Sequence, residues 1–382
     1  MSDGGRRIVI EGWRLFPHSY AIVNQWQILA LLRKGHAVDF HDLPYQDLKS
    51  PTVHGFLAPQ DEQKVTLLTK VDANHSYDLC YRISYPFNLG NRALGGAKAK
   101  RLVVFGTAEH QFLSADLAVK PDIDLLNSDE TFFVVTPSAW SAKGFLRLGL
   151  SPSRVKVIPH GVDPATFNGN RSQREGVRNQ LGLRGFAFLH CGAMTRNKGV
   201  DLLIRAFRIL IDKHHDVQLV LKGTDRLYGS NELVFSYLNS LDYYGQRAVA
   251  EKLVYVGNVV SMSAMADLYR AADCYVSPYR AEGFNLPVLE AAACGTPVIC
   301  TNGGPTDEFV SGTFCRKISS AFNEAANGSW LEPDLDHLVV LMEEALQDDN
   351  LRRTALVEGP SFVSREHTWD DIVDRLISVA GG

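Results

Sequence analysis

The sequence predicts an α/β protein of two units, each with a parallel sheet covered by helices. The chain has 382 residues, which is more than one hydrophobic core usually holds, so two domains are expected. Short apolar runs alternate with longer amphipathic runs almost throughout, and this alternation stops and restarts near Val162. Because such alternation is typical of parallel sheets with helices on both faces, the restart indicates two sheets rather than one large sheet.

The first unit is expected to span residues 1–162. Its apolar runs have the length of strands, and a longer run at residues 20–32 has the length of a helix. The expected strands cover residues 7–10, 37–40, 79–82, 102–105, 132–135 and 155–158. The turn-rich segment Pro-His-Gly-Val-Asp-Pro follows the last of these strands and ends the unit.

The second unit is expected to span residues 163–362, and residues 363–382 to form a helix that packs back on the first unit. The expected strands cover residues 186–191, 217–221, 253–256, 274–277 and 296–301, and the clearest helices cover residues 200–211 and 264–272. Ligands bind beyond the carboxyl ends of the strands in open parallel sheets. Two facing units would therefore make a cleft between them.

Composition excludes several classes of function. The net charge is −4 with no long basic run, which argues against nucleic acid as the main partner. No apolar run has the length of a membrane span or a leader peptide, so a cytoplasmic protein is expected. The six cysteines are scattered through apolar segments without paired zinc spacing, and we expect reduced core residues.

The stretch RAEGFNLPVLEAAACGTPVICT carries two glutamates, Glu282 and Glu290, around a short turn. Asn285 is a favourable N-cap, Pro287 suits the first turn of a helix and Gly295 ends it, so a short helix should begin near Leu286. Glu282 then lies in the loop before the helix and Glu290 one turn inside it. One turn rises only about 5.4 Å, so both carboxylates can reach one ligand.

The start of this helix also offers unpaired backbone N–H groups and positive dipole, which favour a phosphate. A ligand with hydroxyls at both ends and phosphate in the middle would fit, which describes a nucleotide sugar. The alternative is that Glu282 only complements the helix dipole and that Glu290 is a solvated helix residue.

Five segments together resemble retaining glycosyltransferase family 4, within the group 1 glycosyltransferases. One segment of this chain resembles the family signature, and it reads EGFNLPVLEAAACGTPVICTNGGPTDEF. Four other segments resemble further family segments, and in chain order they read TPSAWSAKGFLRLGL, VKVIPHGVDPATF, CGAMTRNKGVDLLIRAF and LVYVGNVVSMSAMADLYRAADCYVSPYRAEGF. The matches cover residues 133–310. The resemblance implies the GT-B fold, in which two facing Rossmann-like domains hold the active site in the cleft between them.

The resemblance also implies roles for the signature residues. Glu282 would bind hydroxyls of the donor sugar, and Glu290 would hold the ribose diol. The backbone amides that approach the sugar would be those of Gly283, Phe284, Asn285 and Leu286. Asn285 stands where the family usually has glycine, and both residue types tolerate a left-handed conformation.

The phosphate segment departs from the family pattern. Lys198 falls on the family's lysine, but Ala193 stands where the family has arginine. A basic group for the departing diphosphate is needed, because charge grows there as the glycosidic bond breaks. Arg196 could supply it from another point of the loop, or could be a solvated turn residue. The nucleotide base of the donor is expected to contact backbone groups near Gly257 and Asn258.

The first unit offers fewer candidates. Glu109 and His110 both lie where the family often has a histidine that contacts the donor sugar, and the resemblance does not decide between them. The alternative for His110 is an ordinary loop histidine. Gly12 keeps a family glycine after the first strand. Ser19 could cap the next helix, which would leave His18 at the edge of the cleft, either as an acceptor contact or merely exposed.

Two further features have simple alternatives. Asp122 and Asp124 form an Asp-x-Asp pair, but they precede a predicted surface helix, and we assign them no metal. A basic cluster could give weak peripheral contact with anionic lipid headgroups, although such a cluster is more often a solvated face. It consists of Arg92, Lys98, Lys100 and Arg101.

The expected function is that of a metal-independent, retaining hexosyltransferase without a cofactor. Its donor would be a nucleoside-diphosphate sugar, either a UDP-hexose or GDP-mannose, and its acceptor a hydroxyl of a glycan, a lipid-linked sugar or a small metabolite. One alternative is a sugar phosphorylase of similar architecture. Another is a sugar-binding subunit without catalysis, for which the alanine at Ala193 is the best support.

Overall fold

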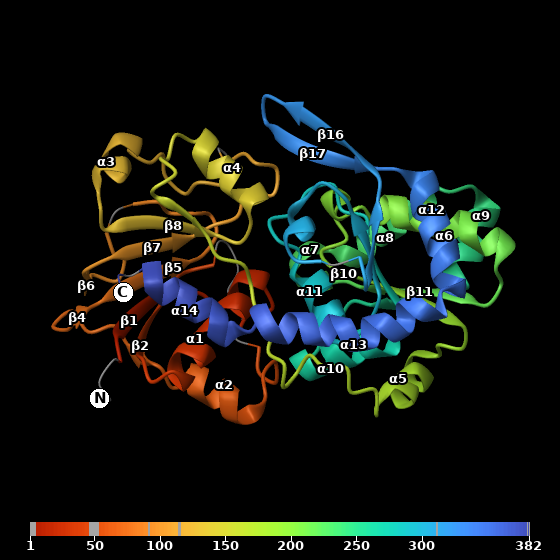
Figure 1. The fold of residues 1–382 in the computed structure, drawn as a ribbon, viewed down its shortest axis with the longest axis horizontal. Helices are drawn as coiled ribbons and strands as arrows, with labels where there is room; N and C mark the ends of the chain where they lie inside the picture. Colours follow the sequence, from red (N-terminus) through yellow and green to blue (C-terminus); the bar gives the residue numbers. More distant parts are fainter. Residues whose placement is uncertain are drawn as a thin grey trace. The chain divides into compact units, whose positions relative to one another are not determined.

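The computed structural model describes residues 5–45, 53–90, 92–113, 116–310, 312–379 and 381 (Figure 1). The chain divides into two compact units, the first made of Met1–Gly161 with His367–Gly382 and the second of Val162–Glu366. Both contain a parallel sheet flanked by helices, so the predicted α/β class is confirmed. The second division falls at the end of helix α13 (Asp349–Glu366) rather than after residue 362, because this helix continues to Glu366.

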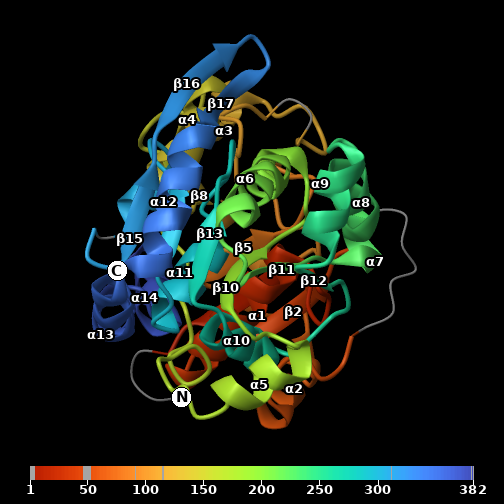
Figure 2. The ribbon, with the colours of Figure 1, turned by 90° about the vertical axis from the view of Figure 1, so that its right-hand side faces the viewer.

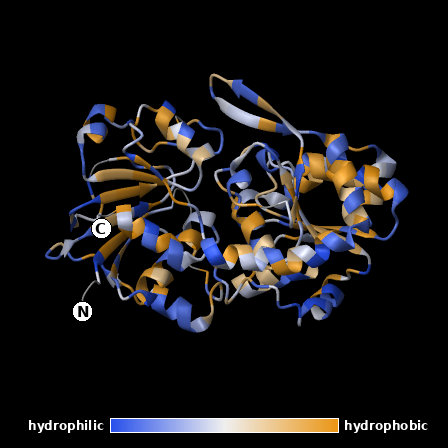
Figure 3. Cartoon of the chain, viewed as in Figure 1, coloured by the Kyte–Doolittle hydropathy of each residue, from blue (hydrophilic) through white to orange (hydrophobic). Residues whose placement is uncertain are grey.

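The sheet of the first unit has seven parallel strands in the order β3-β2-β1-β5-β7-β8-β9. They are β1 (Arg7–Gly12), β2 (Ala37–Asp42), β3 (Thr69–Lys70), β5 (Leu79–Ile83), β7 (Leu102–Phe105), β8 (Phe132–Thr136) and β9 (Val155–Val157). These strands are mainly hydrophobic (Figure 3), as expected for a sheet covered on both faces. The order reverses between β1 and β5, and the carboxyl ends of two such strands are where a ligand is expected.

The C-terminal segment belongs to the first unit although the whole second unit precedes it. Its helix α14 (Trp369–Val379) contacts α1 (Ser19–Arg33), and there Arg33 lies 2.6 Å from Asp370 and Lys34 lies 2.8 Å from Asp374. The other elements of the unit are packed around the same sheet. They are α1 (Ser19–Arg33), α2 (Pro59–Thr66), α3 (Ile123–Ser128), α4 (Ala139–Arg147), α14 (Trp369–Val379) and the short pair β4 (Ser76–Tyr77) and β6 (Lys98–Ala99).

The sheet of the second unit has six parallel strands in the order β12-β11-β10-β13-β14-β15. They are β10 (Phe186–Cys191), β11 (Val217–Lys222), β12 (Leu253–Val256), β13 (Cys274–Ser277), β14 (Val298–Thr301) and β15 (Cys315–Ile318). Figure 2 shows β13, β10, β11 and β12 one after another. The order reverses between β10 and β13, so a ligand of this unit is expected at their carboxyl ends.

Helices and one hairpin complete the second unit. The hairpin of β16 (Ser320–Ala325) and β17 (Gly328–Pro333) extends from its sheet (Figure 1). The helices are α5 (Arg174–Leu181), α6 (Val200–Lys213), α7 (Asp225–Tyr228), α8 (Ser230–Asn239), α9 (Tyr243–Ala250), α10 (Met262–Ala271), α11 (Leu286–Ala293), α12 (Leu335–Gln347) and α13. Short 3-10 turns cover Arg196–Lys198 and Pro305–Glu308.

Alternation along the strands sends side chains to two different faces of the second sheet. Phe188 and its neighbours on adjacent strands belong to the hydrophobic core that includes α6 and α12. Cys191 and Lys222 have the opposite parity on their strands and therefore face the other side. The helices on that side are α10 and α11, and the ring of Tyr269 in α10 lies 5.7 Å from that of Tyr275 in β13.

Several side features of the sequence have structural explanations. All six cysteines are buried and free, as predicted. Asp122 caps α3 by accepting from the backbone N–H of Leu125 at 3.0 Å, and Asp124 lies in the first turn of that helix. No group of three or more potential metal ligands occurs among the described residues. The described helices are likewise too short or too polar to span a membrane.

Candidate functional site

The site of the second unit begins where β13 ends and α11 starts. Asn285 occupies the N-cap position in a left-handed conformation, with φ at 76°. The prediction that its side chain caps the helix is wrong, because the amide Nδ2 instead donates to Ser277 Oγ at 2.9 Å. Asparagine tolerates the left-handed region better than most residues, so it serves where the family has glycine. Its side chain also ties the loop to the end of β13.

Glu282 and Lys198 meet in this loop region. The Nζ atom of Lys198 lies 3.0 Å from Oε1 of Glu282, and their side chains are only 16% and 13% exposed. The backbone N–H groups of Arg280 and Ala281 donate to the carbonyl of Asn197 at 2.7 and 3.2 Å, which joins the two loops. The expected sugar carboxylate and the expected phosphate lysine are thus in direct contact.

Arg280 organises this contact, although the sequence analysis gave it no role. It is 6% exposed, and its guanidinium binds both carboxylate oxygens of Asp201 at 2.7 and 2.9 Å and those of Glu332 at 3.0 Å. It also donates to the carbonyl of Arg196 at 2.9 Å. Arg280 therefore connects the start of α6, the hairpin and the phosphate turn to the loop that carries Glu282.

Glu290 lies inside α11 and is 9% exposed, so the alternative of a solvated helix residue is wrong. The hydroxyl of Tyr269 donates to its Oε2 at 2.7 Å. Burial raises the pKa of Glu290 to about 7, and the hydrogen bond from Tyr269 opposes this shift. The carboxyl group therefore changes charge near neutral pH, as a group poised for a polar ligand would.

Two further buried ionisable side chains lie at the ends of β10 and β11, and sequence reasoning missed both. Lys222 donates to the carbonyl of its neighbour Gly223 at 2.5 Å, and burial lowers the pKa of its ammonium group. His190 Nδ1 lies 2.8 Å from the carbonyl of Val276, and its Nε2 has no partner within the described part of the chain. Burial lowers the pKa of His190 to about 4, so its ring is neutral. A polar residue at or next to the last position of an apolar run was the available signal.

The remaining residues of the phosphate turn are more exposed. The side chain of Arg196 is exposed and makes no hydrogen bond or ion pair with a described residue, while its carbonyl is used by Arg280. Ala193 accepts from Ser230 Oγ through its carbonyl at 3.1 Å. At the expected base loop Asn258 is exposed, and Gly257 packs so closely on the Asp225 carboxylate that a Cβ atom would clash.

The candidates of the first unit follow β1 and β7. Gly12 ends β1 next to β5, and a Cβ atom there would clash with the carbonyl of Ile83. Of the two residues after β7, Glu109 is half-buried and its carbonyl accepts from Trp140 Nε1 at 2.8 Å, whereas His110 is exposed. The sequence candidates Gly12, Glu109 and His110 thus all lie at or beyond the carboxyl ends of strands, on one edge of the first sheet.

His18 and not Ser19 caps helix α1, so that expectation is corrected. Nδ1 of His18 accepts from the backbone N–H of Tyr20 at 3.1 Å, and Ser19 is the first helical residue. The His18 ring lies 5.1 Å from the rings of both Trp13 and Tyr20. Burial lowers the pKa of His18 to about 4, against the opposing effect of the Glu109 carboxylate. A neutral, packed imidazole is therefore the N-cap, and the alternative of a merely exposed His18 is wrong.

The basic cluster of the first unit is partly engaged in internal contacts. Lys100 lies 2.7 Å from Asp78, and Arg101 donates to the carbonyl of Val379 at 3.0 Å. These contacts leave less free positive charge than the sequence indicated, and lipid contact stays a prediction.

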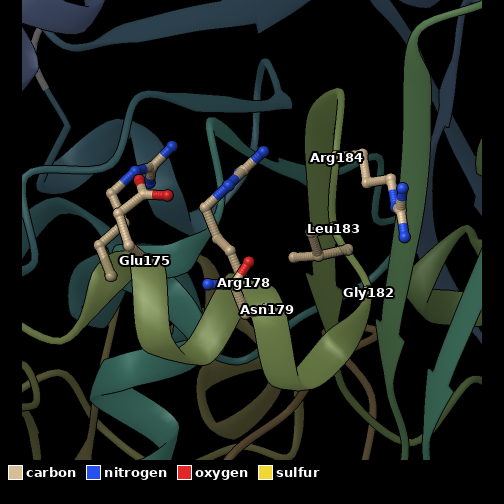
Figure 4. A pocket seen from close by; sticks show the side chains of 7 residues that line it. Glu175, Arg178, Asn179, Gly182, Leu183 and Arg184 are labelled. Atoms are coloured by element: carbon tan, nitrogen blue, oxygen red, sulfur yellow. The ribbon is translucent and has the colours of Figure 1, made fainter.

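A pocket along α5 is lined by the arginines of that helix and lies away from the site. Figure 4 shows Arg178 and Arg184 at this pocket, which is also lined by Arg174. Arg174 and Arg178 lie 2.5 and 3.0 Å from the Asp273 carboxylate. Because Asp273 precedes β13, the pocket lies at the amino edge of the sheet, opposite the loops that carry Glu282 and Lys198.

Comparisons of sequence agree with this geometry. Residues 185–328 match the family model described as Glycosyl transferases group 1. An uncharacterised glycosyltransferase of Methanocaldococcus jannaschii is 25% identical over 91% of this chain and 90% of its own. D-inositol 3-phosphate glycosyltransferase 1 of Catenulispora acidiphila is 32% identical over 60% of this chain and 52% of its own. Mannosylfructose-phosphate synthase of Agrobacterium fabrum is 27% identical over 61% and 49%. The chain thus spans about half the length of the last two relatives.

Solved structures share the architecture of both units. The Anabaena protein HepE, solved with UDP and glucose, aligns with a TM-score of 0.69 at 18% identity over 98% of each chain. A glycosyltransferase from Rickettsia africae aligns with a TM-score of 0.70 at 14% identity over 98% of each chain. Sucrose-phosphate synthase from Thermosynechococcus elongatus aligns with a TM-score of 0.69 at 17% identity over 98% of each chain. The family match confirms the predicted resemblance to the group 1 glycosyltransferases over residues 185–328, and the likenesses to solved structures confirm the predicted GT-B fold.

Proposed function

We propose that this enzyme is a retaining, metal-independent glycosyltransferase of family 4. It would move a hexose from a nucleoside-diphosphate sugar to a hydroxyl acceptor. The observation that carries the proposal is the contact of Lys198 with Glu282 at the carboxyl edge of the second sheet, beside a helix that holds the buried Glu290. One cation and two carboxylates match the diphosphate, the sugar hydroxyls and the ribose diol of such a donor.

In this proposal the donor separates the ion pair and gives each partner a new role. The ammonium of Lys198 would stabilise the diphosphate, where negative charge grows as the glycosidic bond breaks. The carboxylate of Glu282 would then accept hydrogen bonds from sugar hydroxyls, while backbone amides of Gly283, Phe284, Asn285 and Leu286 approach the same sugar. Arg196 would be a weaker contact to the diphosphate, because its side chain is exposed.

Glu290 would bind the ribose hydroxyls. Its carboxyl pKa is raised to about 7 by burial, and hydroxyl donors favour the charged form, so binding would lower this pKa again. This role separates a nucleotide-sugar enzyme from a sugar phosphorylase, because inorganic phosphate has no ribose. The base would lie against the backbone near Gly257 and the exposed Asn258.

The first unit would take the acceptor, with Gly12 and either Glu109 or His110 facing the reacting sugar. Retention needs no protein nucleophile if the leaving phosphate takes the proton of the acceptor hydroxyl on the same face. The chain would then orient the substrates and stabilise the developing charge, and the reaction would need no cofactor. HepE, a protein of the same fold, was solved with UDP-glucose, which supports a UDP-hexose as donor ahead of GDP-mannose.

A thermal-shift panel of UDP, GDP, ADP and TDP tests the donor class. A nucleotide at 100 times its dissociation constant should stabilise the protein by about 2.7 kcal/mol, which is readily detected. Release of free sugar from the matching donor then tests catalysis. Stabilisation by none of the four would overturn the nucleotide donor.

The alanine at Ala193 favours one second candidate, a subunit that binds the donor without turning it over. That protein would bind a nucleotide in the panel but neither hydrolyse the donor nor transfer its sugar. Parent enzyme assayed beside a Glu282→Gln variant would give no activity in either sample, whereas a transferase loses activity only in the variant.

A further inference from the structure

Lys222 is a buried cation without a counter-charge. It is the last residue of β11, it is 6% exposed, and its Nζ donates to the carbonyl of Gly223. Among the described residues it forms no ion pair and no other side-chain hydrogen bond. An ammonium group has three donors, and burying such a charge without a partner is strongly unfavourable. A residue of this kind needs an explanation that packing alone does not give.

The position of Lys222 puts it at the carboxyl edge, next to the phosphate turn. Lys222 pairs in register with Cys191, and the backbone N–H of Gly192 donates to the carbonyl of Lys222 at 3.0 Å. Cys191 and Lys222 share the face of the sheet that α10 and α11 cover. The charges of both Lys222 and Glu290 act on the Cys191 thiol, whose pKa burial raises to about 12. Lys222 and Glu290 therefore both influence Cys191, and neither forms an ion pair with a described residue.

No carboxylate of the described residues compensates the charge of Lys222 at hydrogen-bond distance. The Asp225 carboxylate raises the pKa of Lys222 through its charge but forms no ion pair with it. Asp225 already accepts from the hydroxyl of Tyr255 and from the backbone N–H of Asn231. Cys191 stays neutral. The missing acceptor must therefore come from outside the described chain.

We infer that Lys222 is a donor-binding residue, whose ammonium group donates to an oxygen of the bound nucleotide. It would supply the positive charge that Ala193 does not provide. The acceptor is either a phosphate oxygen or a carbonyl oxygen of the base, both of which accept hydrogen bonds from an ammonium group. The inference rests on the proposed function and adds to it a residue that the family motifs do not mark.

The test measures two properties of a Lys222 variant, which are its melting temperature without nucleotide and its affinity for the nucleotide. Lys222→Met keeps the length of the side chain and removes the buried charge, so its melting temperature without nucleotide should rise above that of the parent. Its affinity for the nucleotide should fall at least tenfold. A matched control is Lys213→Met, an exposed lysine at the end of α6 and so at the opposite edge of the sheet, which should change neither property.

Calorimetry with UDP and uridine, and with GDP and guanosine, distinguishes the two oxygen sources. If Lys222→Met loses affinity for the nucleoside diphosphate alone, Lys222 contacts a phosphate. If it loses affinity equally for the nucleoside, Lys222 contacts the base. If Lys222→Met does not fold, Lys222→Gln keeps N–H donors without the charge and allows the same comparison. Parent-like affinity in a folded variant would overturn the inference and leave the proposed function intact. A parent that binds none of these nucleotides would overturn both.

Discussion

Exchanging Glu282 for glutamine should separate turnover from nucleotide affinity. In the parent the Glu282 carboxylate lies 3.0 Å from the Lys198 ammonium, with both side chains largely shielded from water. At an effective dielectric constant of about 20, unit charges at this separation attract by about 5 kcal/mol before desolvation is counted. The nucleotide diphosphate must compete with that attraction for the same lysine.

Glu282→Gln keeps the shape of the side chain and removes the competing charge. Because desolvation offsets much of the Coulomb attraction in a buried pair, the net competition is about 1 kcal/mol, or a few-fold in affinity. The variant should therefore bind UDP equally well or a few-fold more tightly. Sugar transfer should fall a hundredfold or more, because one group that stabilises the transition state is lost, which is worth about 3 kcal/mol.

Calorimetry with UDP and initial rates at saturating acceptor measure the two effects on the same protein samples. Lys198→Ala is the matched comparison, since it should lower both UDP affinity and transfer. Transfer at the parent rate in Glu282→Gln would show that Glu282 only holds Lys198 in place. Weaker UDP binding in that variant would refute the idea that carboxylate and diphosphate compete.

Variants at three further residues test the rest of the site. Glu290→Ala should weaken nucleotide binding by about 1.5–3 kcal/mol. Because the carboxyl pKa is about 7 and the charged form is the better acceptor, parent affinity should fall as the pH drops below that value, and Glu290→Gln should remove this pH dependence in calorimetry. Arg280→Lys should lower kcat with little change in KM and lower the melting temperature, because lysine lacks the fork that binds two carboxylates; unchanged kcat would deny Arg280 a positioning role. Arg196→Ala should lower transfer by less than about tenfold against a hundredfold for Lys198→Ala, and equal losses would instead make Arg196 the replacement for the arginine missing at Ala193.

Local signals predicted most of the fold and half of the site. Apolar runs bounded by turn residues located the strands of both sheets except the edge strands β3 and β15, which were missed. The cap and stop signals around Asn285 and Gly295 located α11 to within one residue. The contact between Lys198 and Glu282 also follows from local order, since each lies in a loop after one of two adjacent strands. What a residue does within such a loop was less predictable. The Asn285 side chain binds Ser277 rather than the helix, and His18 takes the cap expected of Ser19.

Residues that depend on pairing across the sequence were missed. Arg280 acquires its role from Asp201 and Glu332, which are 79 and 52 positions away, and no local pattern links them. Lys222 looks like the polar end of a strand until the register beside Cys191 shows that it is enclosed. The burial of Glu290 likewise depends on Tyr269 of a different helix. The roles of these three residues depend on their neighbours in the folded structure and not on residue type.

The arrangement of charges explains how the site can be ordered before a donor arrives. Lys198 needs a fixed position to stabilise charge that develops during the reaction, because groups that must reorganise contribute less. Glu282 holds Lys198 from one side, and the carbonyls of Arg196 and Asn197 fasten the same turn to Arg280 and the signature loop. Since Arg280 is itself held by two carboxylates, its charge is balanced and it does not attract the diphosphate away from Lys198. Among the described cations at and beside the phosphate turn, the exposed Arg196 and the buried Lys222 have no carboxylate partner, and only the buried one pays a desolvation cost that a bound donor can relieve.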